Sequence, residues 1–236
     1  MIRIAAVGDV HVGDDTHGRL REAWRHVNDT ADVLLLAGDL TRCGTADEAR
    51  ILIDELADVQ VPVVTVLGNH DHHADETSKL RGVLEHAGVC VLEGDGTVLE
   101  VGGQRLGVAG TKGFGGGFSG ACTSEFGEPE TKAFARHSRE VAGTLHAALD
   151  ALDCDVKVAL THYAPVPDTL VGERLEIYPF LGSYLLGEAI DAGGASLALH
   201  GHAHAGSEKG VTPGGVSVRN VAQPVIRQAY ALYTIG

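Results

Sequence analysis

The amino-acid sequence predicts an α/β fold with a mixed β-sheet. Three apolar runs near the start, at Ile2–Val7, Val33–Ala37 and Val61–Leu67, have the unbroken hydrophobicity of buried parallel strands. Segments with helical apolar spacing lie between these runs, which indicates β-α-β units with right-handed crossovers. At 236 residues, and without a visible linker or internal repeat, we expect residues 1–236 to form a single domain.

The helices of the first third follow from local patterns. A first helix is expected where Leu20, Trp24 and Val27 recur at helical spacing. A second helix opens at Thr45, because Glu48 three residues later completes the capping-box pattern. A third helix follows the third strand, with apolar residues at the same spacing.

The middle of the chain consists of short apolar segments separated by glycine-rich turns. Strands are expected at Val89–Val91, Thr97–Val101 and Arg105–Ala109. Because these strands follow one another closely, we expect antiparallel pairing here and therefore a mixed sheet. A glycine-rich loop, Gly110–Gly120, comes next.

The last part of the chain returns to alternating helices and strands. A long helix is expected from Pro129 to Leu152, and strands are expected at 156–160 and 196–199. Two further strands, at 216–221 and 229–235, are expected to pair with each other in antiparallel fashion.

Composition narrows the classes of partner. The formal net charge is -14, so the chain has no basic field to attract a nucleic-acid backbone, and we expect no dedicated nucleic-acid binding. The cysteines Cys43, Cys90, Cys122 and Cys154 form no CxxC pair, which is typical of reduced thiols in a cytoplasmic protein. No apolar run reaches transmembrane length, and the start of the chain lacks a signal-type cleavage site, so no membrane partner is expected.

Polar side chains with metal-binding chemistry follow five of the predicted strands. One aspartate after a strand is ordinarily a turn residue or a helix cap, but turn chemistry does not explain five such strand ends. The carboxyl edge of an open α/β sheet is where ligands bind. The residues are Asp9 and His11, Asp39, Asn69 and His70, His162, and His202 with His204.

The donor atoms of this set suggest a pair of metal ions. Carboxylate, amide and imidazole groups together suit Mn, Fe or Zn. Seven donors exceed the four of a tetrahedral ion, whereas two ions that share one carboxylate accommodate them. By itself, the histidine cluster at residues 200–204 is more typical of a polar loop; the other strand ends make a metal site the better interpretation.

These motifs resemble a known family. In order and approximate spacing they match the five-part signature of the calcineurin-like metallophosphoesterase superfamily. The matching segments are Asp9-Val-His11, Gly38-Asp39, Gly68-Asn69-His70-Asp71, His162 and Gly201-His202-Ala203-His204. The resemblance implies a four-layer sandwich of two mixed β-sheets flanked by α-helices, with a site for two divalent metal ions.

The resemblance also implies roles for single residues. It assigns to one ion Asp9, His11, Asp39 and His204. It assigns to the other ion Asp39 as a bridge, Asn69, His162 and His202. His70 is expected beside the metals as a catalytic residue that stabilises the transition state or protonates the leaving oxygen. Asp71 is a second catalytic candidate because it is placed to orient His70; a plain loop carboxylate is an equally good interpretation.

The motifs also indicate a branch of the superfamily. The second and third motifs read GDLTRCG and GNHD, so the arginines of the Ser/Thr protein phosphatases are missing. The stretches GTKGFGGGF, THYAP and EIYPFLGS resemble bacterial Icc-related phosphoesterases. The implied activity is hydrolysis of phosphate esters by a hydroxide that two metal ions activate. A small nucleotide-like phosphodiester is the expected substrate.

Other functions and weaker site candidates remain open from the sequence. The alternatives are a non-catalytic interaction module on the same fold, a phosphomonoesterase, and a nuclease, which the acidic charge disfavours. Lys112 and His73 are candidates for substrate binding, although a flexible loop and a solvent-exposed side chain are the simpler interpretations. The loops Gly110–Gly120 and Tyr163–Gly182 are candidates to cover the substrate.

Overall fold

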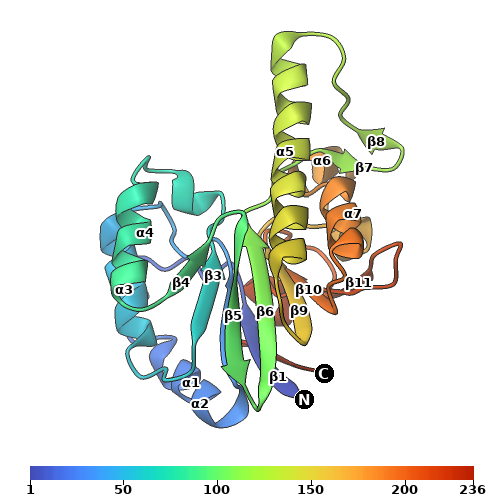
Figure 1. Ribbon diagram of the computed structural model, residues 1–236. Coiled ribbons are helices and arrows are strands. Elements are labelled where there is room, and N and C mark those ends of the chain that lie inside the picture. Colours follow the sequence, from blue (N-terminus) through green and yellow to red (C-terminus); the bar gives the residue numbers. More distant parts are fainter.

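Two β-sheets lie face to face in the computed structural model, which describes residues 1–236 (Figure 1). The first sheet has the strand order β13 (Ala231–Ile235), β1 (Ile2–Val7), β2 (Val33–Ala37), β3 (Val63–Val66) and β4 (Cys90–Leu92). The second has the order β11 (Lys209–Val211), β12 (Ser217–Asn220), β10 (Leu197–His200), β9 (Val156–Thr161), β6 (Gln104–Thr111) and β5 (Asp95–Val101). A small hairpin is formed by β7 (Gly117–Phe118) and β8 (Ala121–Cys122).

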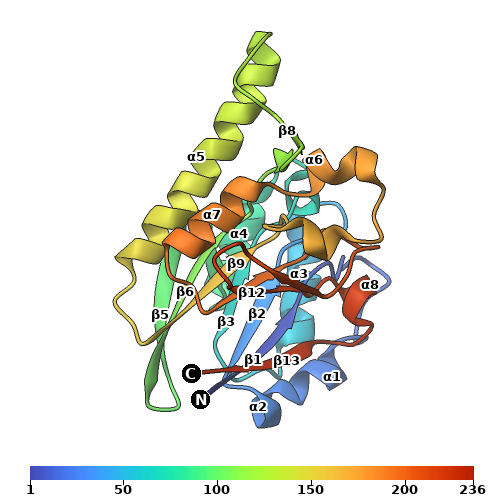
Figure 2. The ribbon, with the colours of Figure 1, turned by 90° about the vertical axis from the view of Figure 1, so that its right-hand side faces the viewer.

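Helices cover the outer face of each sheet. Those on the first sheet are α1 (Arg21–Arg25), α2 (Val27–Thr30), α3 (Ala46–Leu56) and α4 (Thr77–His86). On the second sheet, α5 (Pro129–Ala151) and α7 (Tyr184–Ala192) lie side by side (Figure 2). The remaining short helices are α6 (Tyr178–Leu181), α8 (Gln223–Ile226), η1 (His70–His72), η2 (Pro167–Leu170) and η3 (Leu175–Ile177).

The hydrophobic core is divided by the sheets, as the alternation of side chains along a strand requires. Ile4 and Leu35 point between the sheets, where they join Val158 and Leu199 of the second sheet. Their neighbours along the strands, such as Leu34, point outward to the helices. The predicted four-layer sandwich of two mixed sheets flanked by helices is therefore confirmed.

Several local expectations hold. Strands β1, β2 and β3 pair in parallel, and Thr45 and Glu48 form a complete capping box at the start of α3. The long helix begins at Pro129 and ends one residue before Leu152. The expected first helix is divided at His26 into α1 and α2. No helix of the chain has the length and apolar character needed to cross a membrane.

Two strand pairings differ from the prediction. Strand β4 pairs in parallel with β3, so the expected antiparallel strand at 89–91 is wrong. The two final strands do not pair with each other: β12 lies in parallel beside β10, while β13 is antiparallel to β1. Apolar pattern identifies a strand but not its partner, because each pairing depends on how the whole sheet is assembled.

Backbone strain is concentrated where strands end. Six residues other than glycine have positive φ, and four of them are metal-ligand candidates from the sequence: Asp9 (56°), His11 (43°), Asp39 (49°) and His202 (69°). A left-handed conformation costs an L-residue roughly 1–2 kcal/mol. Such strain persists where the surrounding structure holds it in place, and it is common at functional sites.

We expect this strain to be measurable at His202. In metal-free protein, His202→Gly should be more stable than His202→Ala by about 1 kcal/mol, because glycine adopts positive φ without a Cβ clash. Urea unfolding of the two variants provides the measurement. His204, whose φ is not positive, serves as the control, and there glycine should be the less stable substitution. Equal stability of the two His202 variants would contradict the strain argument.

Candidate metal centre

The ends of strands β1, β2 and β10 bring four side chains together. Donor atoms of Asp9, His11, Asp39 and His204 all lie within 4.8 Å of one another. Asp9 and Asp39 are buried, whereas the side chain of His204 is 44% exposed. The group therefore lies at the edge of the two sheets, with carboxylates beneath and imidazoles toward solvent.

A second group shares a member with the first. Asp39, His162 and His202 also place their donor atoms within 4.8 Å of one another. Asn69 extends this group, because its Oδ1 lies 3.0 Å from Nε2 of His162. Asp39 is the one residue common to both groups, as expected for a bridging carboxylate.

The donor set fits a pair of cations. The Nε2 atoms of His11 and His204 face each other at 3.5 Å. Nδ1 of His162 lies 2.8 Å from the Ala37 carbonyl oxygen, and its Nε2 points at Asp39 Oδ1 at 3.3 Å. A backbone carbonyl on one ring nitrogen leaves the other nitrogen free to bind a metal. Electron-rich atoms that converge in this way are stabilised by positive charge between them.

The electrostatics of the buried side chains agree with this interpretation. Burial raises the pKa of Asp39, but His162 and the backbone N–H of His70 outweigh that effect, so the pKa lies well below its usual value. Burial lowers the pKa of His202 to about 3, which keeps this imidazole neutral and able to act as a ligand. Burial also lowers the pKa of His162, but the Asp39 carboxylate outweighs this and raises it to about 9. The Asp39 carboxylate therefore attracts positive charge, while His202 stays neutral.

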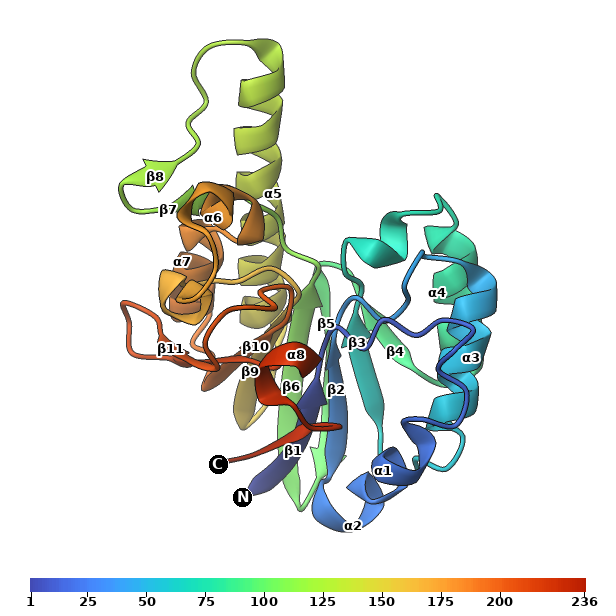
Figure 3. The same ribbon diagram turned by 180° about the vertical axis from the view of Figure 1, so that it is seen from behind.

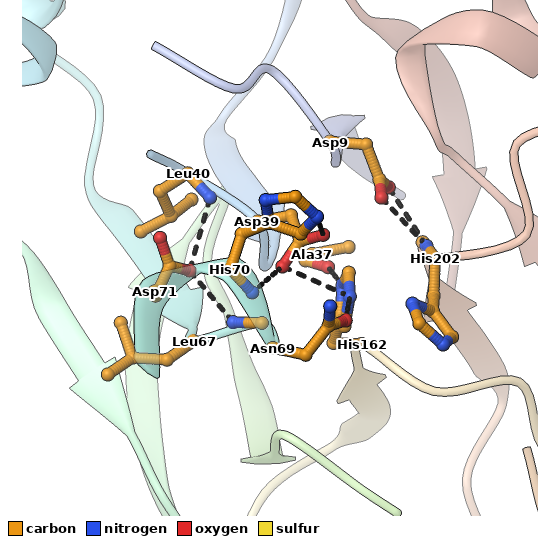
Figure 4. Close-up of polar contacts among 12 residues, drawn as sticks. Asp9, Ala37, Asp39, Leu40, Leu67, Asn69, His70, Asp71, His162 and His202 are labelled. Atoms are coloured by element: carbon orange, nitrogen blue, oxygen red, sulfur yellow. Dashed lines mark hydrogen bonds and ion pairs between the residues drawn. The ribbon is translucent and has the colours of Figure 1, made fainter. Parts of the chain in front are cut away.

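Two glycines, Gly68 and Gly201, provide the space in which the carboxylates of Asp39 and Asp9 lie. A Cβ on Gly68 would collide with Oδ1 of Asp39, and one on Gly201 would collide with Oδ2 of Asp9. Neither position has space for a side chain. The carboxylate of Asp9 also accepts the backbone N–H of His202, at 3.0 and 2.9 Å, which links the ends of β1 and β10 (Figure 4).

His70 lies beside this cluster without belonging to either group. Its Nε2 is 4.0 Å from Oδ2 of Asp39, and its ring contacts the ring of His11 edge-on at 4.6 Å between centroids. Nδ1 of His70 lies 2.8 Å from the carbonyl oxygen of Arg42, which fixes the ring orientation. The side chain is 43% exposed, so the imidazole borders solvent.

No hydrogen bond joins Asp71 to the imidazole of His70, which favours the interpretation of Asp71 as a loop carboxylate. Asp71 is fully buried and turned away from the imidazole (Figure 4). Its carboxylate accepts hydrogen bonds from the backbone N–H groups of Leu40, Thr41 and Gly68, at 3.1, 2.9 and 2.8 Å. Burial raises the pKa of this carboxyl group. Asp71 therefore joins the loop after β2 to the loop after β3.

His200, the first histidine of the 200–204 cluster, has a different role from His202 and His204. The ring of His200 is buried, with Nε2 at 2.8 Å from Oγ1 of Thr169 and no contact with either donor group. Asn220 was not among the residues that the sequence analysis singled out. Asn220 lies beside His200 in the sheet register and donates from Nδ2 to the Ala203 carbonyl at 2.8 Å. Only the parallel pairing of β12 with β10 reveals this support.

The two substrate-binding candidates occupy different environments. Lys112 is partly buried, and its ammonium group lies 5.4 Å from the centroid of the Phe114 ring and 5.3 Å from that of Tyr163. Burial lowers its pKa. The carbonyl oxygen of Lys112 accepts the N–H of His162 at 3.0 Å. His73 is exposed, and no hydrogen bond of its side chain reaches the donor groups.

The two sides of the centre differ in chemistry. On the side of His11 there is a cavity of about 570 Å³. Its lining includes Asp9, His11, Thr16, Arg19, Arg42, Gln223, Arg227 and Gln228. On the side of His202, the Tyr163 ring lies 4.3 Å from the imidazole between centroids. The Phe180 carbonyl oxygen lies 3.3 Å from its Nε2, and the Phe180 side chain is exposed.

Solved structures resemble the whole chain. Phosphopantetheinyl hydrolase from Mycobacterium tuberculosis is 17% identical, with a TM-score of 0.72 over 99% of this chain and 98% of that chain. A hypothetical protein from Thermus thermophilus is 18% identical, with a TM-score of 0.56 over 93% of this chain and 75% of that chain. At these identities the likeness establishes the fold. No curated protein matches the sequence.

A family model described as calcineurin-like phosphoesterase matches residues 2–206. This range includes every candidate ligand from Asp9 to His204. The convergence of these side chains at the strand ends agrees with the match. The chain belongs to the calcineurin-like phosphoesterase family, whose members hydrolyse phosphoesters.

Proposed function

We propose that this protein is a metal-dependent phosphodiesterase that acts on a small, nucleotide-like phosphodiester. The observation that carries the proposal is the carboxylate of Asp39, which belongs to both groups of converging donor atoms. One carboxylate shared by two such groups is the arrangement that a pair of metal ions requires.

The proposed ligands divide between two ions of Mn, Fe or Zn. Those of the first ion are Asp9, His11, Asp39 and His204, and those of the second are Asp39, Asn69, His162 and His202. The side-chain chemistry supports this division, since mixed oxygen and imidazole donors suit these metals. Bound ions would supply an activated water for attack on phosphorus and would neutralise charge on the phosphoryl oxygens.

The remaining steps fall to the protein. His70 is proposed to protonate the leaving oxygen or to stabilise charge in the transition state. Its side chain is exposed and its Nε2 lies 4.0 Å from Oδ2 of Asp39, while the Arg42 carbonyl oxygen fixes its other nitrogen. A diester carries two organic groups on phosphorus. The cavity beside His11 offers room for one of them, and the other would lie on the side of His202, toward the Tyr163 ring.

The aromatic side favours a planar or extended apolar substituent. Tyr163 and the exposed Phe180 provide ring surface there, and Lys112 lies against Tyr163. The name of the Mycobacterium tuberculosis neighbour, phosphopantetheinyl hydrolase, is in keeping with a phosphate that carries an extended organic arm.

Removal of the shared charge tests the metal assignment. Asp39→Asn keeps the shape of the side chain but loses the carboxylate, so bound metal should fall below one ion per chain and turnover should be abolished. Elemental analysis of Mn-loaded, desalted protein gives the stoichiometry. Asp54→Asn on the exposed face of α3 removes the same charge and should retain the wild-type metal content. Less than one ion per wild-type chain would favour a non-catalytic module instead.

Replacement of His70 separates chemistry from metal binding. His70→Ala should lower kcat by roughly 10²–10⁴-fold, the usual contribution of a general acid, while both metals stay bound. The rate is followed with bis-4-nitrophenyl phosphate and the metals by elemental analysis. His86→Ala, on exposed helix α4, is the control. An unchanged rate with metals in place would rule out the role given to His70.

Preference for diesters tests the substrate class. With Mn present, kcat/KM for bis-4-nitrophenyl phosphate should exceed that for the monoester 4-nitrophenyl phosphate by about tenfold or more, because a diester occupies both sides of the centre. Nucleoside cyclic phosphates extend the comparison to nucleotide-like compounds. A strong preference for the monoester would show that the protein is a phosphomonoesterase.

A further inference from the structure

The cavity beside His11 has an unusual concentration of positive charge. Arg19, Arg42 and Arg227 all line it, in a chain that has 18 Lys and Arg residues against 32 Asp and Glu residues. The same cavity is lined by Asp9 and His11, so it opens directly from the candidate metal centre. In an acidic protein, three arginines around one cavity provide a local site for negative charge.

Two of these arginines have no partner of their own. Arg42 is paired with Asp15 at 2.6 Å, whereas Arg19 and Arg227 form no ion pair. No side-chain hydrogen bond of either residue satisfies its guanidinium donors within the protein. A guanidinium presents donors in a planar fork that matches the oxygens of a phosphate or carboxylate. These two side chains are therefore available to a ligand.

The loop that carries Arg19 is held by hydrogen bonds to Glu55 on α3. The buried carboxylate of Glu55, on α3, accepts the backbone N–H groups of Gly18, Leu20 and Arg21, with the last two at 2.7 and 2.9 Å. Glu55 thereby secures the turn on both sides of Arg19. The position of this arginine at the cavity is thus determined by the core.

The guanidinium of Arg42 packs against the backbone of Gly13. A Cβ on Gly13 would lie 3.0 Å from Cζ of Arg42, so the absence of a side chain at residue 13 leaves room for the guanidinium. Gly13 is held in a turn by Thr16, whose Oγ1 accepts its N–H at 3.0 Å. The Arg42 carbonyl oxygen also lies 2.8 Å from Nδ1 of the His70 ring, so this residue connects the cavity with the catalytic candidate.

Arg227 is the residue that follows the last turn of α8, and its backbone is strained. This helix lies close to the end of β1 (Figure 3), where Gln223 donates its N–H to the Gly8 carbonyl at 2.9 Å. Arg227 then adopts φ of 52°, a left-handed conformation that disfavours a residue with a Cβ. Glycine would relieve this strain, so an arginine here points to a use for its side chain.

We propose that this cavity is a subsite for a second anionic group of the substrate. The inference rests on the proposed function: the diester at the metal centre carries another phosphate, held by Arg19 and Arg227 with Arg42 at the rim. The substrate class is thereby narrowed to phosphodiesters that bear a second phosphate, either in a pyrophosphate linkage or elsewhere on the arm that enters this cavity. The aromatic side near His202 receives the other arm.

Inorganic pyrophosphate and orthophosphate serve as probes. Calorimetric titration of Mn-loaded, desalted protein should show pyrophosphate binding at least about tenfold more tightly than orthophosphate, since only pyrophosphate reaches the arginines. The double variant Arg19→Gln/Arg227→Gln should lose this advantage and keep the orthophosphate Kd. The double variant Arg25→Gln/Arg50→Gln, which removes two exposed arginines outside the cavity, should keep the advantage.

Hydrolysis of bis-4-nitrophenyl phosphate, which has one phosphate only, gives an independent readout. Its kcat/KM should stay measurable in the Arg19→Gln/Arg227→Gln variant, because the candidate metal ligands are intact there, so a lost pyrophosphate advantage does not come from a damaged centre. Equal affinity of wild-type protein for the two probes, or equal loss in the Arg25/Arg50 control, would overturn the subsite. The titration needs no turnover, so a pyrophosphate advantage without any diester hydrolysis would support the subsite and reject the phosphodiesterase.

Discussion

The carboxylate of Asp39 is the interaction on which the rest of the centre depends. It follows a fully buried strand, accepts the backbone N–H of His70 at 2.8 Å and lies 3.3 Å from His162 Nε2. Its charge is therefore kept inside the protein, where a low dielectric makes its attraction for a cation strong. Both groups of donor atoms are arranged around this one side chain.

Two packed sheets make that arrangement stable. Asp9, Asp39 and Asn69 come from the first sheet, whereas His162 and His202 come from the second, so the centre forms only when the sheets are packed together. Asp71 adds a brace inside the first sheet by accepting backbone N–H groups from two strand-end loops. The positive φ values of the candidate ligands show that local backbone preference yields to this arrangement.

The loops on the two sides of the centre carry different kinds of side chain. The segments that carry Arg19, Arg42 and Arg227 surround a polar cavity on one side. Tyr163 and Phe180 provide aromatic surface on the other. A phosphodiester is an asymmetric ligand when its two organic groups differ, and a site with two unlike sides can bind it in one orientation. Orientation decides which ester bond is placed for cleavage.

Local patterns in the chain were enough to predict the strand-end clusters, the capping box at Thr45 and an α/β fold with a mixed sheet, because apolar periodicity can be read without knowing any long-range contact. The four-layer sandwich was implied by the resemblance of the motifs to the calcineurin-like metallophosphoesterases. The division of the ligands and the role of His70 remain predictions. The packed structure was needed to establish the partners of β12 and β13, the turn of Asp71 away from His70, and the support that Asn220 gives to the loop after β10. Each of these joins segments that are not adjacent in the chain, and such contacts exist only after the sheets have packed.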